Sequence, residues 1–129
     1  MDADHSHMFN NNCTIHGLDI SVGLDLVGGQ MEDFIALLNI FMEHHGDDMT
    51  KLELILEKGD THNAILLTHS LRGSTSVLGM SEIYTQANEL EVALKAGYSK
   101  IAINKLVVPL SLTMANMFQD LKLGLTSSY

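Results

Sequence analysis

Hydrophobic residues recur every three or four positions over most of this chain, which is the period of a helix with one buried face. The clearest case is residues 30–58, where the apolar positions are Phe34, Leu37, Leu38, Phe41, Met42, Met49, Leu52, Ile55 and Leu56. Gly46 lies in the middle of this segment and lowers helix stability by about 1 kcal/mol relative to alanine. Because apolar stripes flank Gly46 on both sides, we expect one long helix here rather than a break.

The same period predicts one short helix before this segment and three long helices after it. They cover residues 19–27, 61–78, 81–96 and 99–125. Asp60 is placed to cap the helix that follows it, and Pro109 should kink the last helix without splitting it. Short connections between amphipathic helices make neighbours antiparallel. The pattern therefore predicts an all-α fold, an antiparallel up-and-down four-helix bundle with a short additional N-terminal helix.

Length and composition are those of one ordered domain with a tail. The chain has 129 residues, 46% of them hydrophobic, with one proline and no tryptophan. This length gives room for a single sizeable core. Residues 1–16 lack hydrophobic periodicity and include three consecutive asparagines. We expect a flexible tail or linker over residues 1–16 and one helical domain over residues 17–129.

Charge and cysteine content narrow the function classes. The formal net charge is −9, with only seven lysines and arginines, so nucleic acids and anionic membranes are poor partners and another protein is the better one. Cys13 is the only cysteine, which excludes an intramolecular disulfide and fits a reducing compartment. The acidic N-terminus is unlike a secretory signal, and no apolar run reaches about 18 residues. We expect a cytoplasmic protein.

The stretch from Thr68 to Gly79 holds the most distinctive chemistry. The only arginine of the chain, Arg72, follows His69 by three residues and Gly73 follows it by four, so both adjoin His69 on a helix surface. One face of this helix forms a predicted core stripe of Ala64, Leu67, Leu71, Ser74 and Leu78. The opposite face carries His62, Ile65, Leu66, His69, Arg72, Gly73 and Ser76.

This arrangement suits an imidazole that carries a phosphoryl group. An exposed histidine has a pKa near 6.5, so at neutral pH most of it is neutral and nucleophilic. Arg72 can hold phosphoryl oxygens by charge-assisted hydrogen bonds, and Gly73 removes a side chain from the face that a partner must approach. No carboxylate lies on the His69 face within one turn, so the site looks incomplete. Carboxylates and Mg²⁺ would have to come from the partner.

The other polar clusters in the sequence give little support for metal binding or catalysis. His44 and His45 lie beside Asp47 and Asp48, but adjacent histidines on a helix point about 100° apart and cannot easily share a metal. The cluster that contains Ser74 has no acidic residue in a triad arrangement, which disfavours hydrolase chemistry. The chain has no Walker sequence and no glycine-rich nucleotide loop, so it should not phosphorylate itself. We therefore expect no cofactor of its own and no independent enzyme activity.

The stretch Thr68–Gly79 resembles the signature of the histidine-containing phosphotransfer (HPt) domain of two-component phosphorelays. That signature has a histidine, two residues, lysine or arginine, glycine, small residues, then leucine and glycine. The similarity covers about residues 17–125. It includes Gly17-Leu18-Asp19, Gly28-Gly29, Gly59-Asp60, Asn88-Glu89-Leu90-Glu91 and Ala96-Gly97.

The resemblance implies a carrier that takes a phosphoryl group from a receiver-domain phospho-aspartate onto His69, at Nε2, and passes it to the aspartate of another receiver. Since a bundle that buries its own apolar stripes can be monomeric, we expect a monomer. Arg72 stands where the family more often has lysine, and Mg²⁺ would belong to the receiver. The docking face would centre on His69 and use Ile65, Leu66 and Ser76. Such a domain can be free-standing or form the C-terminal part of a hybrid sensor kinase.

Two other interpretations stay open at this point. The chain could be the phospho-accepting domain of a chemotaxis-type histidine kinase, phosphorylated by a separate ATP-binding domain. It could also be a non-catalytic helical protein-binding module in which His69 is incidental. The identity of a phosphoryl donor, or its absence, distinguishes the three.

Overall fold

The computed structural model describes residues 15–126, and every regular element in this range is a helix. The helices are α2 (Ile20–Leu26), α3 (Met31–His45), α4 (Asp48–Glu57), α5 (Thr61–Leu78), α6 (Ser81–Lys95) and α7 (Lys100–Thr126). The all-α prediction is confirmed. Most of the tail expected over residues 1–16 lies outside the described residues. Ile15, at its end, is buried in the core.

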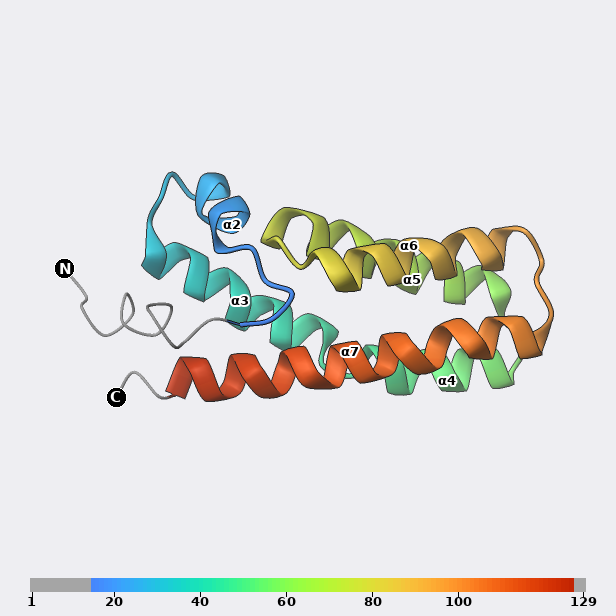
Figure 1. The fold of residues 1–129 in the computed structure, drawn as a ribbon. Helices are drawn as coiled ribbons and strands as arrows, with labels where there is room; N and C mark the ends of the chain where they lie inside the picture. The colour runs from blue at the N-terminus through green and yellow to red at the C-terminus, as the bar shows by residue number, and fades with distance from the viewer. Residues whose placement is uncertain (1–14, 127–129) are drawn as a thin grey trace.

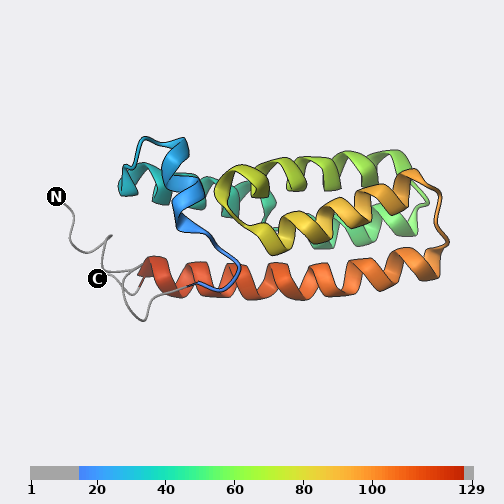
Figure 2. The ribbon, with the colours of Figure 1, turned by 45° about the horizontal axis from the view of Figure 1, so that its top comes forward.

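The helices form a bundle in which α5 and α6 pack most closely together (Figure 1). Helix α7 packs along α6, and α4 packs along α5. The chain reverses direction between α4 and α5, between α5 and α6 and between α6 and α7, whereas α4 continues in the general direction of α3 (Figures 1 and 2). Helix α7 runs almost the whole length of the bundle (Figure 2). Helix α2 lies at one end, where it contacts α5 and α3. This arrangement places the helix that carries His69 directly beside α6.

The prediction of one unbroken helix over residues 30–58 is wrong, because the chain leaves the helix at residues 46–47 and divides it into α3 and α4. Gly46 contributes to the break. A Cβ atom at this position would lie 2.7 Å from the carbonyl oxygen of Met42, so a larger residue would force the backbone to move. The low helix propensity of glycine lets the break form there.

Polar side chains stabilise this break from inside the bundle. His45 and Asp48, on either side of it, are both buried, and Nδ1 of His45 lies 2.6 Å from Oδ2 of Asp48. Nε2 of the same ring lies 3.0 Å from Oγ of Ser74 on α5. Buried polar groups need such partners, because an unpaired one would lose its hydrogen bonds to water without replacement. The junction of α3 and α4 is therefore tied to the His69 helix.

The core stripe of α5 differs from the predicted one. Ala64, Leu71 and Leu78 are buried as expected, and all belong to the core cluster. Leu67 and Ser74 are only half-buried, and Thr68 and Thr75 take the two core positions instead.

The threonines can be buried because their hydroxyl groups are satisfied within the helix. The hydroxyl of Thr68 donates to the carbonyl oxygen of Ala64 at 3.0 Å, and that of Thr75 donates to the carbonyl oxygen of Leu71 at 2.9 Å. Both bonds follow the i to i−4 pattern open to threonine in a helix. The cost of burying a hydroxyl group is thereby offset.

Both ends of α5 are fixed as the sequence predicts. Oδ1 of Asp60 accepts a hydrogen bond from the backbone N–H of Asn63 at 3.1 Å, and hydrogen bonds from Asn63 lower the pKa of Asp60. At the other end Gly79 adopts a left-handed conformation with φ 79°. Its carbonyl oxygen accepts a 2.7 Å hydrogen bond from the backbone N–H of Asp19 just before α2.

Helix α7 continues unbroken through Pro109, so the proline does not split the last helix, as expected from the sequence.

Candidate functional site

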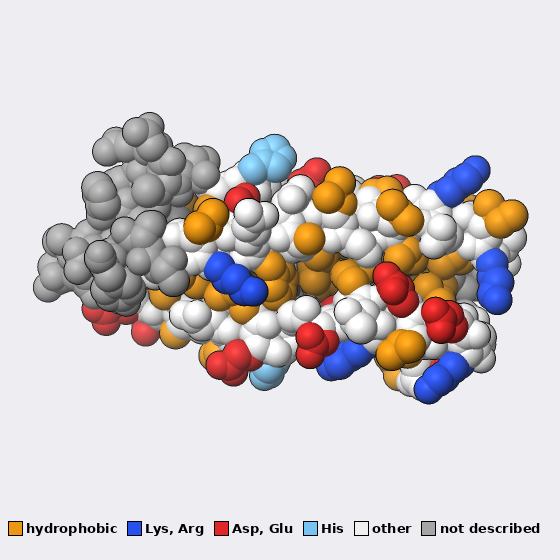
Figure 3. Space-filling model, turned by 90° about the horizontal axis from the view of Figure 1, so that it is seen from below, with side chains coloured by type: hydrophobic (Ala, Val, Ile, Leu, Met, Phe, Trp, Pro, Cys, Tyr) orange, Lys and Arg blue, Asp and Glu red, His pale blue; other side chains and the backbone are white. Residues whose placement is uncertain are grey.

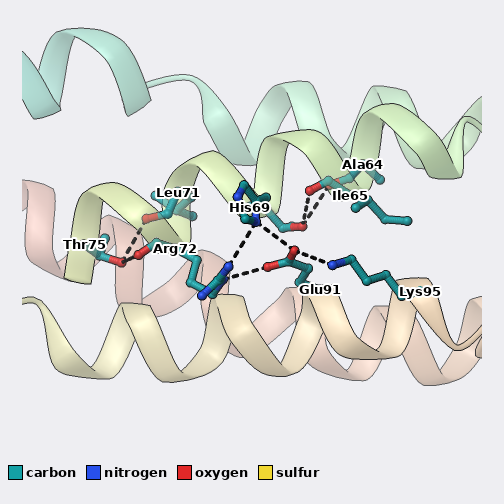
Figure 4. Close-up of polar contacts among 9 residues, drawn as sticks. Ala64, Ile65, His69, Leu71, Arg72, Thr75, Glu91 and Lys95 are labelled. Atoms are coloured by element: carbon teal, nitrogen blue, oxygen red, sulfur yellow. Dashed lines mark hydrogen bonds and ion pairs between the residues drawn. The ribbon is translucent and has the colours of Figure 1, made fainter. Parts of the chain in front are cut away.

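His69 lies midway along α5 on the side that faces α6 (Figure 4). Its side chain is 59% exposed, so it points away from the core as predicted. Glu91 on α6 lies beside it and is almost completely enclosed, with 4% of its side chain exposed. The close packing of α5 and α6 brings these two residues together from positions far apart in the sequence.

Glu91 is the centre of a four-residue cluster. Its Oε2 lies 2.9 Å from Nδ1 of His69 and 3.0 Å from Nζ of Lys95. Its Oε1 accepts a 2.8 Å hydrogen bond from Nε of Arg72. Both oxygens of the carboxylate therefore have partners, and Glu91 joins α5 to α6 through charge-assisted bonds.

The partners of Glu91 keep it ionised. Burial by itself would raise the pKa of this carboxyl group, but hydrogen bonds from Lys95, His69 and Arg72 outweigh burial and lower the pKa to about 2. At neutral pH Glu91 is therefore a carboxylate, which can only accept hydrogen bonds.

The ionised carboxylate favours one tautomer of His69. Nδ1 lies near both Glu91, which can only accept, and Arg72, which can only donate. The shorter contact is the one with Glu91, and it favours the tautomer that carries the ring proton on Nδ1. Both polar contacts of the ring within residues 15–126 are made by Nδ1. In this tautomer the lone pair is on Nε2, and a neutral imidazole nitrogen with a lone pair can act as a nucleophile.

Arg72 holds its guanidinium group next to the imidazole. Its Nη2 lies 3.0 Å from Nδ1 of His69, and hydrogen bonding to Glu91 is the main reason that the pKa of Arg72 is raised, with Tyr84 adding to it. With Nδ1 protonated, the Arg72–His69 approach is a close contact rather than a hydrogen bond. The guanidinium is therefore held beside the imidazole by its bond to Glu91.

The other predicted site residues surround this cluster without joining it. Leu66 and Ser76 are exposed, and Ile65 is half-buried with its side chain packed against the core. Gly73 is exposed, and no atom lies within 4 Å of the place that its Cβ would occupy. Packing within residues 15–126 therefore does not explain a glycine at position 73.

Glu91 and Lys95 were missed as site residues from sequence. The observation that no carboxylate shares the His69 face of its own helix is correct, but α6 supplies one across the helix interface. A signal was available: Glu91 adjoins Leu90 and lies four residues after Ala87, on the apolar side of its helix. A carboxylate at a position predicted to be buried must be paired with a cation or strong donors, and Lys95 follows at i+4.

A second group of hydrogen-bonded side chains corrects the expectation that no acidic residue lies in a triad arrangement with Ser74. Asp48, His45 and Ser74 line up in the order of a serine hydrolase triad, although the sequence suggested no acidic partner for that serine cluster. Ser74 lies inside α5, where backbone N–H groups are used by the helix and cannot form an oxyanion hole. His45 and Asp48 are also buried. We therefore assign the hydrogen bonds among Asp48, His45 and Ser74 a structural role.

The described residues contain no group of three or more His, Cys, Asp or Glu side chains that could hold a metal ion. The carboxylate nearest His69 is that of Glu91, and its two oxygens already bind Lys95, His69 and Arg72. Glu91 is therefore better suited to orient the imidazole than to bind a cation such as Mg²⁺.

Comparison with known families agrees with this geometry. The family model described as the Hpt domain matches residues 36–123. The chain belongs to the Hpt family. Hpt domains carry out histidine phosphotransfer in two-component signalling, interact with response-regulator receiver domains and have no ATP-binding site of their own. No curated protein and no solved structure matches this Hpt domain.

The low pKa of Glu91 predicts how the stability of this Hpt domain depends on pH. Folding lowers that pKa from 4.5 to about 2, so the unfolded chain binds the proton more tightly. The stabilisation is complete above pH 4.5 and should fall as the pH drops toward 2, by on the order of 3 kcal/mol in total. Urea unfolding at several pH values would measure this loss.

Glu91→Gln is the matched control for this effect, because it keeps the shape and removes the titration. The free-energy difference between wild type and Glu91→Gln should shrink as the pH falls from neutral to 3. Parallel curves for the two proteins would show that Glu91 is not a major source of the acid sensitivity.

Proposed function

We propose that this Hpt domain is a phosphorelay intermediate that accepts a phosphoryl group on Nε2 of His69 from a receiver phospho-aspartate and passes it to another receiver aspartate. The observation that carries the proposal is the 2.9 Å bond between Nδ1 of His69 and the ionised Glu91. This bond leaves the Nε2 lone pair available. It also places a negative charge beside the ring that becomes cationic when Nε2 forms its bond to phosphorus.

The transfer step balances without an acid or base from this chain. The Nε2 lone pair attacks phosphorus, the N–P bond forms, and the P–O bond to the receiver aspartate breaks to release a carboxylate. Nδ1 keeps its proton throughout and donates a hydrogen bond to Glu91, whose negative charge stabilises the phosphoimidazolium. Attack by the carboxylate of a second receiver reverses these bond changes and restores neutral His69.

Arg72 is suited to neutralise the phosphoryl oxygens during transfer. Its Nε is bound to Glu91, which orients the guanidinium, while the side chain remains 28% exposed to an incoming group. Mg²⁺ in this scheme is supplied by the receiver, since Glu91 is fully engaged. Phosphoryl transfer depends mainly on such positioning and charge neutralisation.

The receiver would dock on the exposed face of α5 around His69. Leu66 is 52% exposed there and Ile65 is half-buried beside it, which gives a small apolar contact next to the imidazole. Gly73 and Ser76 extend this face without bulky side chains. Because receivers of two-component systems act in the cytoplasm, we place this domain there, either free-standing or at the C-terminal end of a hybrid sensor kinase.

Gly73→Ala should separate folding from docking. A glycine inside α5 is less favourable than alanine by about 1 kcal/mol, and the site of the new methyl group is empty in this chain. We therefore expect the free energy of unfolding to rise by up to about 1 kcal/mol while the transfer rate from a receiver falls. Urea unfolding and phosphoryl-transfer kinetics measure the two effects. An unchanged transfer rate would remove Gly73 from the docking face.

The direct test incubates the chain with a phosphorylated receiver domain and Mg²⁺ and locates the label by mass spectrometry. The proposal expects an acid-labile, base-stable phosphate on His69. Label from a histidine-kinase ATP-binding domain, with none from several receivers, would favour the phospho-accepting domain of a chemotaxis-type kinase. No label from either donor would leave a helical protein-binding module.

A further inference from the structure

Helix α7 is apolar on more than one face. Its inner stripe belongs to the bundle core and consists of Ile103, Val107, Leu110, Met114, Met117 and Leu121. Its outer side carries four further large apolar residues that are 59–73% exposed, namely Ile101, Val108, Leu112 and Leu123. By length and composition Lys100–Leu125 could cross a membrane, yet only 28% of its most apolar window is buried. A helix that is apolar all round is normally covered on all sides.

A groove beside this outer stripe adds to the uncovered surface. It runs between α4 and α7, and one half is lined by Met49, Met114, Phe118 and Leu123. The other half is lined by Leu56, Ile103, Val107 and Val108, and Ser111 lies where the halves meet. Figure 3, which views this side of the molecule, shows hydrophobic side chains on the floor of the hollow and charged side chains along its edges.

The outer stripe is nearly symmetric about Leu112. Ile101 and Leu123 each lie eleven residues from Leu112, and Lys105 and Gln119 each lie seven residues from it. On a helical wheel these residues fall within about 60° of one another. If two copies of α7 pair antiparallel, Leu112 meets its own copy and Ile101 meets Leu123 of the partner subunit. Lys105 then faces Gln119 of the partner subunit, and Val108 faces Asn116 of the partner subunit, so no two lysines of the stripe are opposed.

We propose that the outer face of α7 and the α4–α7 groove bind a second copy of this chain in an antiparallel, two-fold symmetric dimer. A two-fold interface requires one surface to be complementary to itself, which the stripe centred on Leu112 satisfies. The stretch from Ile101 to Leu123 is about 33 Å long. With a width of two helices it covers on the order of 600 Å² per partner, at the lower end for a stable interface.

This dimer leaves the phosphotransfer site open. His69 lies on α5 facing α6, and α7 and the groove lie on the other side of the bundle (Figures 1 and 4). A membrane is a poorer occupant of the same face, because Lys105 and Gln119 lie within the stripe and would lose their hydrogen bonds in the hydrocarbon core. The proposal departs from the monomer expected from the sequence, since that expectation assumed every apolar stripe to be buried within one chain.

Analytical ultracentrifugation of the full chain tests the dimer. The average mass should rise from one chain toward two as the concentration increases over about 1 to 500 µM, the range in which an interface of this size associates. Leu112→Glu places two carboxylates at the symmetry axis and should weaken association at least about tenfold. Val77→Glu, which adds the same charge at an exposed apolar position on α5, should leave association unchanged.

Disulfide trapping checks the register independently of affinity. In a Cys13→Ser background, Leu112→Cys should form a disulfide-linked dimer on oxidation, whereas Val77→Cys should not. Circular dichroism of each variant confirms that it is folded. The proposal is overturned if the wild type stays monomeric throughout the concentration range, if Leu112→Glu dimerises as well as Val77→Glu, or if a monomeric chain instead sediments with lipid vesicles.

Discussion

His69→Gln should abolish phosphoryl acceptance from every receiver while leaving the Hpt domain folded. Glutamine has no nitrogen lone pair that can attack phosphorus, so the effect is a complete loss rather than a slower rate. Label on the wild type and none on the variant, measured side by side with the same phosphorylated receiver and Mg²⁺, is the expected result.

Stability measurements show whether this loss of phosphoryl acceptance comes from the missing nucleophile or from a damaged fold. The side chain of His69 is 59% exposed and makes one hydrogen bond to Glu91, which the amide group of glutamine can partly replace. The free energy of unfolding should therefore change by no more than about 1 kcal/mol. A loss of several kcal/mol would mean that His69 has a structural role. Label that persists in His69→Gln would move the phosphoryl-accepting site to another residue, with His62 on the same helix tested next.

Leu71→Ala should lower the free energy of unfolding by about 2–5 kcal/mol, the usual range for truncating a buried leucine. Leu71 lies two residues from His69 but points into the core, where its side chain is completely buried. The loss combines the hydrophobic transfer energy of the missing atoms with the cavity that they leave. Urea unfolding at neutral pH measures it directly.

Leu66→Ala is the matched control, because it makes the same chemical change on the same helix at a position that is 52% exposed. Its free energy of unfolding should fall by less than about 1 kcal/mol. Equal losses at the two positions would contradict the orientation of α5 on which the site depends. If Leu66 contacts the receiver, Leu66→Ala should also slow transfer in spite of its small effect on stability.

The helices on either side of the site were predictable because their patterns are local. A run of apolar residues at helical spacing, a capping aspartate at position 60 and a glycine at 79 mark α5 within a residue or two of its observed ends. The break at Gly46 was not predicted, because the glycine by itself costs only about 1 kcal/mol. The buried contacts of His45 with Asp48 and Ser74 favour the break, and Ser74 lies far away in the sequence.

The buried face of α5 also could not be predicted fully from the sequence. Sequence reasoning placed Leu67 and Ser74 in the core stripe because it sorted the residues only by their 100° spacing around the helix. The observed stripe contains Thr68 and Thr75, whose hydroxyl groups bond to carbonyl oxygens one turn earlier. A small rotation of the helix about its axis decides between the two stripes, and only packing against neighbouring helices sets that rotation.

The sequence by itself determined the helical class, the helix that carries His69, the neighbouring Arg72 and Gly73, and a resemblance to the HPt family that the family match bears out. These features depend on spacing along one helix or on residue identity. Only the tertiary structure decided that Glu91 and Lys95 belong to the site, because they come from α6 and reach His69 through helix packing. The pairing of Glu91 with Nδ1 in turn favours the tautomer whose lone pair is on Nε2, a property that spacing along a single helix cannot encode.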